Sequence, residues 1–190
     1  MTRPLPVSEM ADADLMGRVA ARDGDAFTEL MRRHEDLVFR VALRMVKDRE
    51  VALDVAQDVF TTLWRKAGRW RGDSAVTTWL YRVTVNASID TLRRLRRRRA
   101  EPLPDTHDPA DPRGEDPFRI AEFDLEEALS RLPVDFRTVI VLADVEGLPL
   151  AEVARLLDLP VGTVKSRLFR ARRLLQPVLG NPPPSSTRPT

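Results

Sequence analysis

A run of prolines and acids near the middle of the chain limits what this sequence can fold into. Residues 100–117 read AEPLPDTHDPADPRGEDP and show no apolar periodicity. Such a segment buries too little apolar surface to offset the entropy lost on ordering, so we expect a flexible acidic linker. The 190 residues are therefore expected to form two small domains, one on each side of this linker.

The linker sets the expected domain boundaries. Residues 1–20 are expected to be a tail that leads into the first helix, with residues 1–10 loose. The first domain is expected over residues 21–99 and the second over residues 118–180. The last residues, 181–190, are rich in proline and serine and are expected to be disordered.

Apolar residues in both blocks recur at helical spacing, and no stretch alternates as a strand does, which predicts an all-α fold. In the first block the periodicity indicates helices over 27–45 and 51–63, with a break near Asp48 or Arg49, and a third from about Thr78 to Arg98. In the second block it indicates helices over 123–132, 134–145 and 150–157, and a last one from Thr163 to about Leu179.

The distribution of charge is more informative than the net charge of +2. Residues 93–99, RRLRRRR, hold six arginines, and residues 163–176 hold five basic groups and no acid. Two basic surfaces separated by an acidic linker favour a polyanion as partner. The alternative is that these arginines contact only solvent and simply take the place of lysine, since the chain has only three lysines.

The segment LPLAEVARLLDLPVGTVKSRLFRARRLL has the spacing of a helix-turn-helix, whose second helix enters the major groove of DNA. Pro160 stops the first helix, Gly162 eases the bend, and Thr163 is the expected N-cap of the second helix. Five positions of the second helix are expected to face inward: Val164, Leu168, Ala171, Leu175 and Val178. The opposite face carries Ser166, Phe169, Arg170 and Arg173, flanked by Thr163 and Lys165.

Hydroxyls, cations and an exposed aromatic ring on one helix face suit contacts with base edges, phosphates and a thymine methyl group. The alternative for this segment is an ordinary helical hairpin whose polar face contacts only solvent.

A second polar stripe runs along the predicted helix from about Thr78 to Arg98. At steps of three or four residues it carries Arg82, Asn86, Asp90, Arg93 and Arg97, beside an expected apolar face of Leu80, Val83, Ala87 and Leu95. The preceding residues 70–81, WRGDSAVTTWLY, combine three aromatic rings with a loop of small polar residues. Such a loop can hold an unstacked base, although for each ring taken singly core packing is the better interpretation.

The segment DVAQDVFTTLW, residues 54–64, places acids beside large apolar groups. Its candidate contact residues are Asp54, Gln57, Asp58, Phe60 and Trp64. Acids are poor partners for DNA, so this face suits a basic protein surface, with an aromatic anchor in a pocket. The alternative is a solvated acidic face.

These segments, in this order, resemble the extracytoplasmic-function (ECF) sigma factors of the sigma-70 superfamily. Residues 54–64 resemble region 2.2, RGDSAVTTWLYRVTVNASIDTLRRLRRR resembles regions 2.3 and 2.4, and EGLPLAEVARLLDLPVGTVKSRLFRARRLL resembles region 4. The resemblance covers roughly residues 20–180. It implies a transcription initiation factor that binds core RNA polymerase and directs it to promoters, acting on both double- and single-stranded DNA.

The resemblance also assigns roles to the candidate residues. The residues implied to read the −35 element are Thr163, Lys165, Ser166, Arg167, Phe169, Arg170 and Arg173. Those implied to recognise and open the −10 element are Trp70, Arg71, Gly72, Asp73, Ser74, Thr77, Arg82, Asn86, Asp90 and Arg93. Those implied to bind core polymerase are Asp54, Gln57, Asp58, Phe60 and Trp64.

The family resemblance further implies an anti-sigma protein as partner, a cytoplasmic location with the option of being held at the membrane by that protein, and no catalytic residue, cofactor or metal. The absence of cysteine and of an apolar run long enough to span a membrane agrees with this. His34 and His107 are interpreted as incidental. Three other functions compete with this interpretation: an autonomous helix-turn-helix regulator of transcription, a hydrolase built on Asp54 and Asp58, and an adaptor that binds only proteins.

Overall fold

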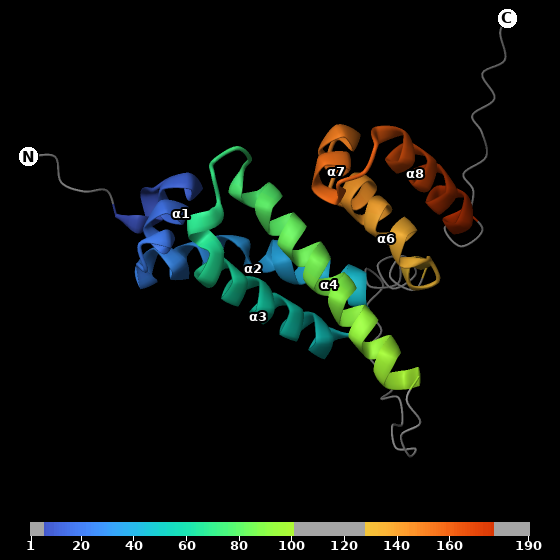
Figure 1. The fold of residues 1–190 in the computed structure, drawn as a ribbon, viewed down its shortest axis with the longest axis horizontal. Helices are drawn as coiled ribbons and strands as arrows, with labels where there is room; N and C mark the ends of the chain where they lie inside the picture. Colours follow the sequence, from blue (N-terminus) through green and yellow to red (C-terminus); the bar gives the residue numbers. More distant parts are fainter. Residues whose placement is uncertain (1–5, 101–127, 177–190) are drawn as a thin grey trace, which may run out of the picture. The chain divides into compact units, whose positions relative to one another are not determined.

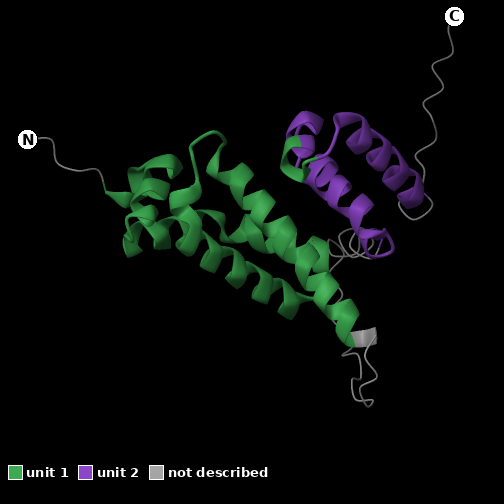
Figure 2. Ribbon diagram, in the orientation of Figure 1, with its two compact units in different colours: residues 1–105, 155–158 green, residues 106–154, 159–190 purple. Residues whose placement is uncertain are grey.

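The computed structural model describes residues 6–100 and 128–176, with the side chains of residues 99 and 100 left out. The chain divides into two compact units, residues 1–105 with 155–158 and residues 106–154 with 159–190 (Figure 2). All regular structure in the described ranges is helical, which confirms the predicted all-α fold of two helical domains. The predicted acidic linker lies outside the described residues.

The first unit is built on three long helices, α2 (Gly24–Val46), α3 (Arg49–Lys66) and α4 (Val76–Ala100), with α1 (Asp12–Ala20) and the 3-10 turn η2 (Ala67–Arg69) against them (Figure 1). The predicted third helix extends two residues further at each end. The largest fully buried side chains of the first unit are Leu15, Met16, Leu30, Met45, Leu63 and Leu80. Packing of the long helices places α3 and α4 side by side.

Local signals fix where these helices begin. The Asp23 carboxylate caps α2 by accepting hydrogen bonds of 3.0 and 3.1 Å from the backbone N–H groups of Asp25 and Ala26. The Ala26 N–H, together with Arg18, lowers the pKa of Asp23. Helix α2 ends at Lys47, whose φ of 67° is left-handed, and Asp48 then caps α3. The predicted break near Asp48 is thus confirmed.

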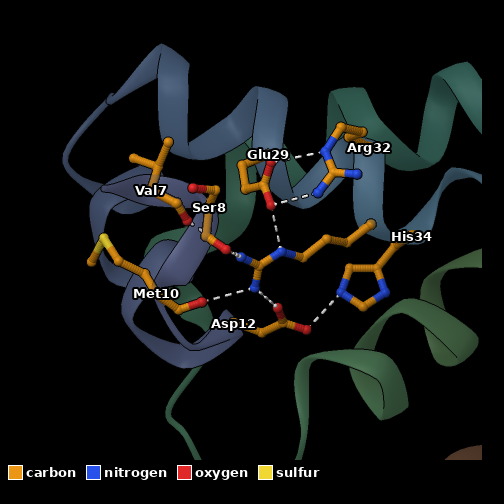
Figure 3. A network of polar contacts seen from close by, with 8 residues as sticks. Val7, Ser8, Met10, Asp12, Glu29, Arg32 and His34 are labelled. Carbon is orange, nitrogen blue, oxygen red and sulfur yellow. Dashed lines mark hydrogen bonds and ion pairs between the residues drawn. The ribbon is translucent and has the colours of Figure 1, made fainter. Parts of the chain in front are cut away.

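The N-terminal residues are more ordered than predicted. Helix α1 buries Leu15, Met16 and Val19 completely, and Val7–Glu9 form a 3-10 turn, η1, where a loose tail was expected. Arg33 on α2 holds this turn by donating hydrogen bonds to the carbonyl oxygens of Val7, Ser8 and Met10 and to the carboxylates of Asp12 and Glu29 (Figure 3). An arginine 23 or more residues away supplies the order that local composition does not predict.

His34 is part of the same network and has a structural role. Its Nε2 lies 2.7 Å from Oδ2 of Asp12, and its side chain is buried (Figure 3). This contact joins α2 to α1. His107, the other histidine, lies outside the described residues.

The predicted apolar face of α4 is only partly correct. Leu80 is buried, but Val83, Ala87 and Leu95 are half-buried, and the core-facing side instead carries Thr84, Ser88 and Thr91. The Thr84 and Ser88 hydroxyls each donate to the carbonyl four residues earlier, at 2.8 Å. This bonding satisfies the hydroxyls and lets polar residues face the core.

Residues 128–176 contain a helical turn at 128–130, α6 (Val134–Ile140), a π-helical turn η3 (Val141–Val145), α7 (Leu150–Leu157) and α8 (Val161–Leu175). All of these residues belong to the second unit except 155–158, which include the end of α7. The helix predicted over 134–145 is therefore α-helical only to Ile140. Arg137 is buried and donates to the carbonyl oxygens of Leu129, Ser130 and Leu132. These bonds add side-chain donors to carbonyls at the end of the preceding helical turn, where the Leu129 carbonyl also accepts from the Leu132 N–H.

Helix α8 begins two residues earlier than predicted. Pro160, with extended backbone, stands at the N-cap, and its carbonyl accepts from the N–H groups of Thr163 and Val164. Thr163 is therefore not the N-cap, and Gly162 lies inside the first turn. The left-handed residue of the connection is Asp158, with φ 53°. A proline here is favourable because it removes one N–H that a helix start would leave unpaired.

Candidate nucleic-acid interface

Helix α8 separates an inner and an outer face as predicted. Val164, Leu168, Ala171 and Leu175 are buried, whereas Val178 lies outside the described residues. The exposed face carries Lys165, Ser166, Phe169, Arg170 and Arg173, with Thr163 half-buried in the first turn. Phe169 is 62% exposed, and the Arg173 guanidinium lies 5.9 Å from the centre of its ring. An apolar ring flanked by cations is thereby available to a partner.

Two other arginines of α8 are engaged within the second unit. Arg167 lies 2.9 Å from the Asp135 carboxylate on α6, and Arg172 donates to Asp144 at 2.8 and 2.7 Å. Hydrogen bonding to Asp144 raises the pKa of Arg172. The structure thus directs Arg167, which belongs to the predicted DNA-reading set, toward α6 instead of the exposed face.

A groove of about 900 Å³ runs between α3 and α4 in the first unit. Three of the predicted −10 residues line it, namely Asn86, Asp90 and Arg93. Arg82 is exposed but does not line the groove. The other lining residues are Asp58, Thr61, Thr62, Arg65, Lys66, Arg69, Trp79, Val83, Ala87, Arg94 and Arg97. Six cations in one groove, against two acids, suit a nucleic-acid strand.

Sequence reasoning missed the opposite side of this groove, formed by Arg65 and Lys66 of α3 and Arg69 of η2. Asp58, Thr62, Arg65 and Arg69 are spaced by three or four residues, so they follow one helix face, and this spacing was the available signal. Trp79 was noticed only as one of three aromatics. That these residues face Asn86 depends on the packing of α3 against α4, which periodicity does not reveal.

The loop that precedes α4 is folded around Trp70. The indole N–H donates to the Ser74 carbonyl at 3.2 Å, and Gly72 adopts a left-handed φ of 74° next to the ring. Arg71 and Asp73 are exposed, and Thr77 is half-buried at the start of α4. Trp70 therefore ties the loop to Ser74, while Arg71 and Asp73 remain exposed.

The candidate polymerase-binding residues divide between surface and core. Asp54, Gln57 and Asp58 are exposed on α3, but Phe60 is buried. Trp64 is half-buried, with its ring 5.2 Å from that of Phe27 and under the Arg22 guanidinium. The structure does not place the two aromatics beside the acids.

An exposed apolar side chain next to Asp54 in the sequence is Leu53, which is 51% exposed. It was missed because sequence reasoning looked for an aromatic anchor. Asp58 also lies 3.8 Å from Arg94, whose Nη2 donates to Thr91 at 2.9 Å.

Within residues 6–100 and 128–176, no three metal-ligating side chains converge. In the same ranges, no helix has the length and hydrophobicity needed to span a bilayer.

Comparisons with known proteins agree with the geometry. The family model for sigma-70 region 2 matches residues 30–98, and that for sigma-70 region 4 matches residues 122–175. The chain is 40% identical over 172 residues to the ECF RNA polymerase sigma factor SigM of Mycobacterium tuberculosis, covering 90% of this chain and 86% of the relative. It is 34% identical to the RNA polymerase sigma-H factor of Pseudomonas aeruginosa, covering 91% and 98%.

Among solved structures, CnrH in complex with the cytosolic domain of CnrY superposes with a TM-score of 0.68 at 26% identity, covering 90% of this chain and 97% of CnrH. Two region models in the expected order, and relatives matched over most of their length, lead to one conclusion. The chain belongs to the ECF sigma factors of the sigma-70 family, the transcription initiation factors that direct RNA polymerase to promoters.

Proposed function

We propose that the two units read two promoter elements while a surface of α3 holds core RNA polymerase. The observation that carries this proposal is the pair of separate cationic surfaces, the exposed face of α8 and the groove between α3 and α4. Each surface alone binds DNA weakly and with strong salt dependence. Attachment of both units to one polymerase raises their effective concentration at the promoter.

The −35 element is read by α8 in the major groove. Lys165, Arg170 and Arg173 donate to guanine edges or phosphates, and Ser166 serves either base or backbone. Phe169 contacts a thymine methyl group, which gives a physical role to a ring that is 62% exposed. Arg167 contributes by orienting α8 through Asp135 rather than by touching bases.

The −10 element is opened at the groove between α3 and α4. Asn86 reads a base edge, Asp90 accepts from a cytosine amino group, and the surrounding arginines bind phosphates. Residues 71–77 hold one base out of the stack, which offsets an unstacking free energy of a few kcal/mol. The left-handed Gly72 and the bond from Trp70 to Ser74 keep this loop in place before DNA arrives.

Core polymerase binds the exposed face of α3 through Asp54, Gln57 and Asp58, with Leu53 as the apolar contact. An anti-sigma protein is a further partner, by analogy with the complex of CnrH and CnrY. The protein acts in the cytoplasm, where its polymerase works, and an anti-sigma protein can hold it at the membrane. No step of this function needs a catalytic residue.

The decisive test is run-off transcription with core polymerase and a genomic promoter library, together with footprinting of the chain alone. We expect specific transcripts, and footprints only when core polymerase is present. A footprint of the isolated chain on palindromic DNA would instead support an autonomous regulator. Absence of promoter-specific transcripts would reject the proposed function.

A further inference from the structure

The polar stripe of α4 continues past the residues assigned to the −10 element. Arg97 follows Asn86 by 11 positions, and at about 100° per residue this brings it back to within about 20° of the same helix face. At about 1.5 Å per residue it lies about 16 Å further along the helix axis. Both side chains line the groove between α3 and α4.

The arginines at the end of α4 differ in what they face. Arg98 lines a second groove, of about 320 Å³, that also holds Asp54 and Asp58 of α3, and Arg94 lines both grooves. Acids therefore offset the positive charge on that side. Arg97 lines the first groove instead, and no ion pair to it occurs among the described residues. Arg96, also exposed and without a described ion pair, flanks it.

The position of the loop decides which form of DNA reaches Arg97. In the proposed function, residues 71–77 hold the unpaired base at the N-terminal end of α4. The C-terminal end of α4 then lies over the side of the promoter that is still paired. A distance of about 16 Å corresponds to about five base pairs at about 3.4 Å each.

We propose that Arg97, flanked by Arg96, binds the phosphates of double-stranded DNA about five base pairs upstream of the nucleotide read by Asn86. The contact lies in the spacer between the two promoter elements. It is independent of sequence, because a guanidinium that reaches only phosphates carries no base information. The inference rests on the proposed function of the −10 groove and adds a duplex-binding surface to it.

A purely structural role is the alternative, since cations near the C-terminus of a helix stabilise it through the helix dipole. Arg98 provides the matched control. It is exposed, sits one position from Arg97 in the same final turn, and carries the same charge, but faces the acidic side of α3. If the arginines act through the helix dipole, replacing Arg97 or Arg98 should have the same effect. If Arg97 binds phosphates, only its replacement should weaken DNA binding.

The experiment uses holoenzyme assembled from the full chain and core polymerase, and fork-junction DNA with an unpaired −10 strand but no −35 element. The upstream duplex extends either about two or about eight base pairs beyond the nucleotide read by Asn86, on either side of the expected contact. For the wild-type chain we expect the longer duplex to increase affinity roughly threefold or more at low salt.

We expect Arg97→Ala to lose most of this gain and to reduce the slope of log affinity against log salt by about 0.9 on the longer probe only. Arg98→Ala should keep both the gain and the slope, and Arg97→Lys should restore most of the binding. An equal loss for Arg97→Ala and Arg98→Ala, or an equal loss on both probes, would overturn the inference. Asn86→Ala is measured alongside: if it binds both probes as wild type does, the −10 assignment itself has failed.

Discussion

The Asp144 carboxylate accepts two hydrogen bonds from Arg172, at 2.8 Å from Nε and 2.7 Å from Nη2. Asp144 lies in the π-helical turn η3, and Arg172 lies on α8, next to the exposed Arg173. The arginines of α8 therefore serve two purposes, some fixing the helix to its unit and others remaining available to DNA. Arg172 and Arg170 represent the two classes.

Replacement of each arginine by alanine should separate these purposes. Arg172→Ala should destabilise the second unit by about 0.5–1 kcal/mol, because it removes a bidentate pair that is partly exposed. Arg170→Ala should leave stability unchanged and weaken binding to −35 DNA. Hydrogen exchange of the α6 and α8 amides measures the first effect, and titration of holoenzyme with −35 DNA measures the second. The reverse pattern would contradict this division.

Much of this fold was predictable because it depends on local signals. The apolar periodicity of α2, α3 and α8 and the break at Asp48 come from residues close together in the sequence. One missed feature depends on a distant partner, because the turn η1 is held by Arg33. The other is local but is not apolar: Thr84 and Ser88 can be buried because they bond to their own helix, and apolar periodicity does not register such bonds.

The candidate site follows the same rule. The exposed face of α8 follows from helical geometry alone, so Phe169 and Arg170 were placed correctly on it. The direction of Arg167 was not predictable, because Asp135 is 32 positions away and only packing brings them together. Likewise, a helical wheel groups Trp64 with the acids of α3, but the ring packs against Phe27.

Asn86→Ala should impair promoter opening more than polymerase binding. Asn86 is exposed in the groove, so the substitution removes a base-edge contact worth about 1–3 kcal/mol without disturbing the core. Permanganate reactivity of unpaired thymines measures the yield of open complex, and pull-down titration measures polymerase binding. An unchanged open-complex yield would remove Asn86 from the proposed site.

Asp58→Ala should weaken binding to core polymerase while the fold stays intact. Asp58 is exposed, and loss of one carboxylate from a charge-complementary interface should reduce affinity several-fold, or roughly 1 kcal/mol. Asp36→Ala on α2 is a control, since it removes another exposed acid from a different helix. Equal affinity of the two variants in a pull-down titration would argue against the α3 surface.

Phe169→Ala should change promoter preference without lowering stability. The ring is 62% exposed and contributes little to the core, so the thermal transition should not move. Loss of its contact with a thymine methyl group should reduce discrimination at one position of the −35 element by roughly 1 kcal/mol. Binding to matched duplexes with thymine or uracil at each position locates the contact. If no position responds to the methyl group in the wild type, the assigned role of Phe169 is wrong.

Acid should destabilise the first unit through Glu29. Hydrogen bonds from Arg32 and Arg33 lower the pKa of this carboxyl from 4.5 to about 2. The folded state therefore binds a proton less readily than the unfolded state does. The stabilisation is fully present above pH 4.5 and is lost as the pH falls toward 2.

The variant Glu29→Gln isolates this contribution, because an amide does not titrate in that range. All three tryptophans lie in the first unit, at positions 64, 70 and 79, so their fluorescence reports its unfolding selectively. We expect the urea midpoint of the wild type to fall more steeply than that of Glu29→Gln between about pH 5 and pH 2. Parallel pH dependence in the two proteins would mean that the Glu29 pairs with Arg32 and Arg33 add no stability to the folded unit.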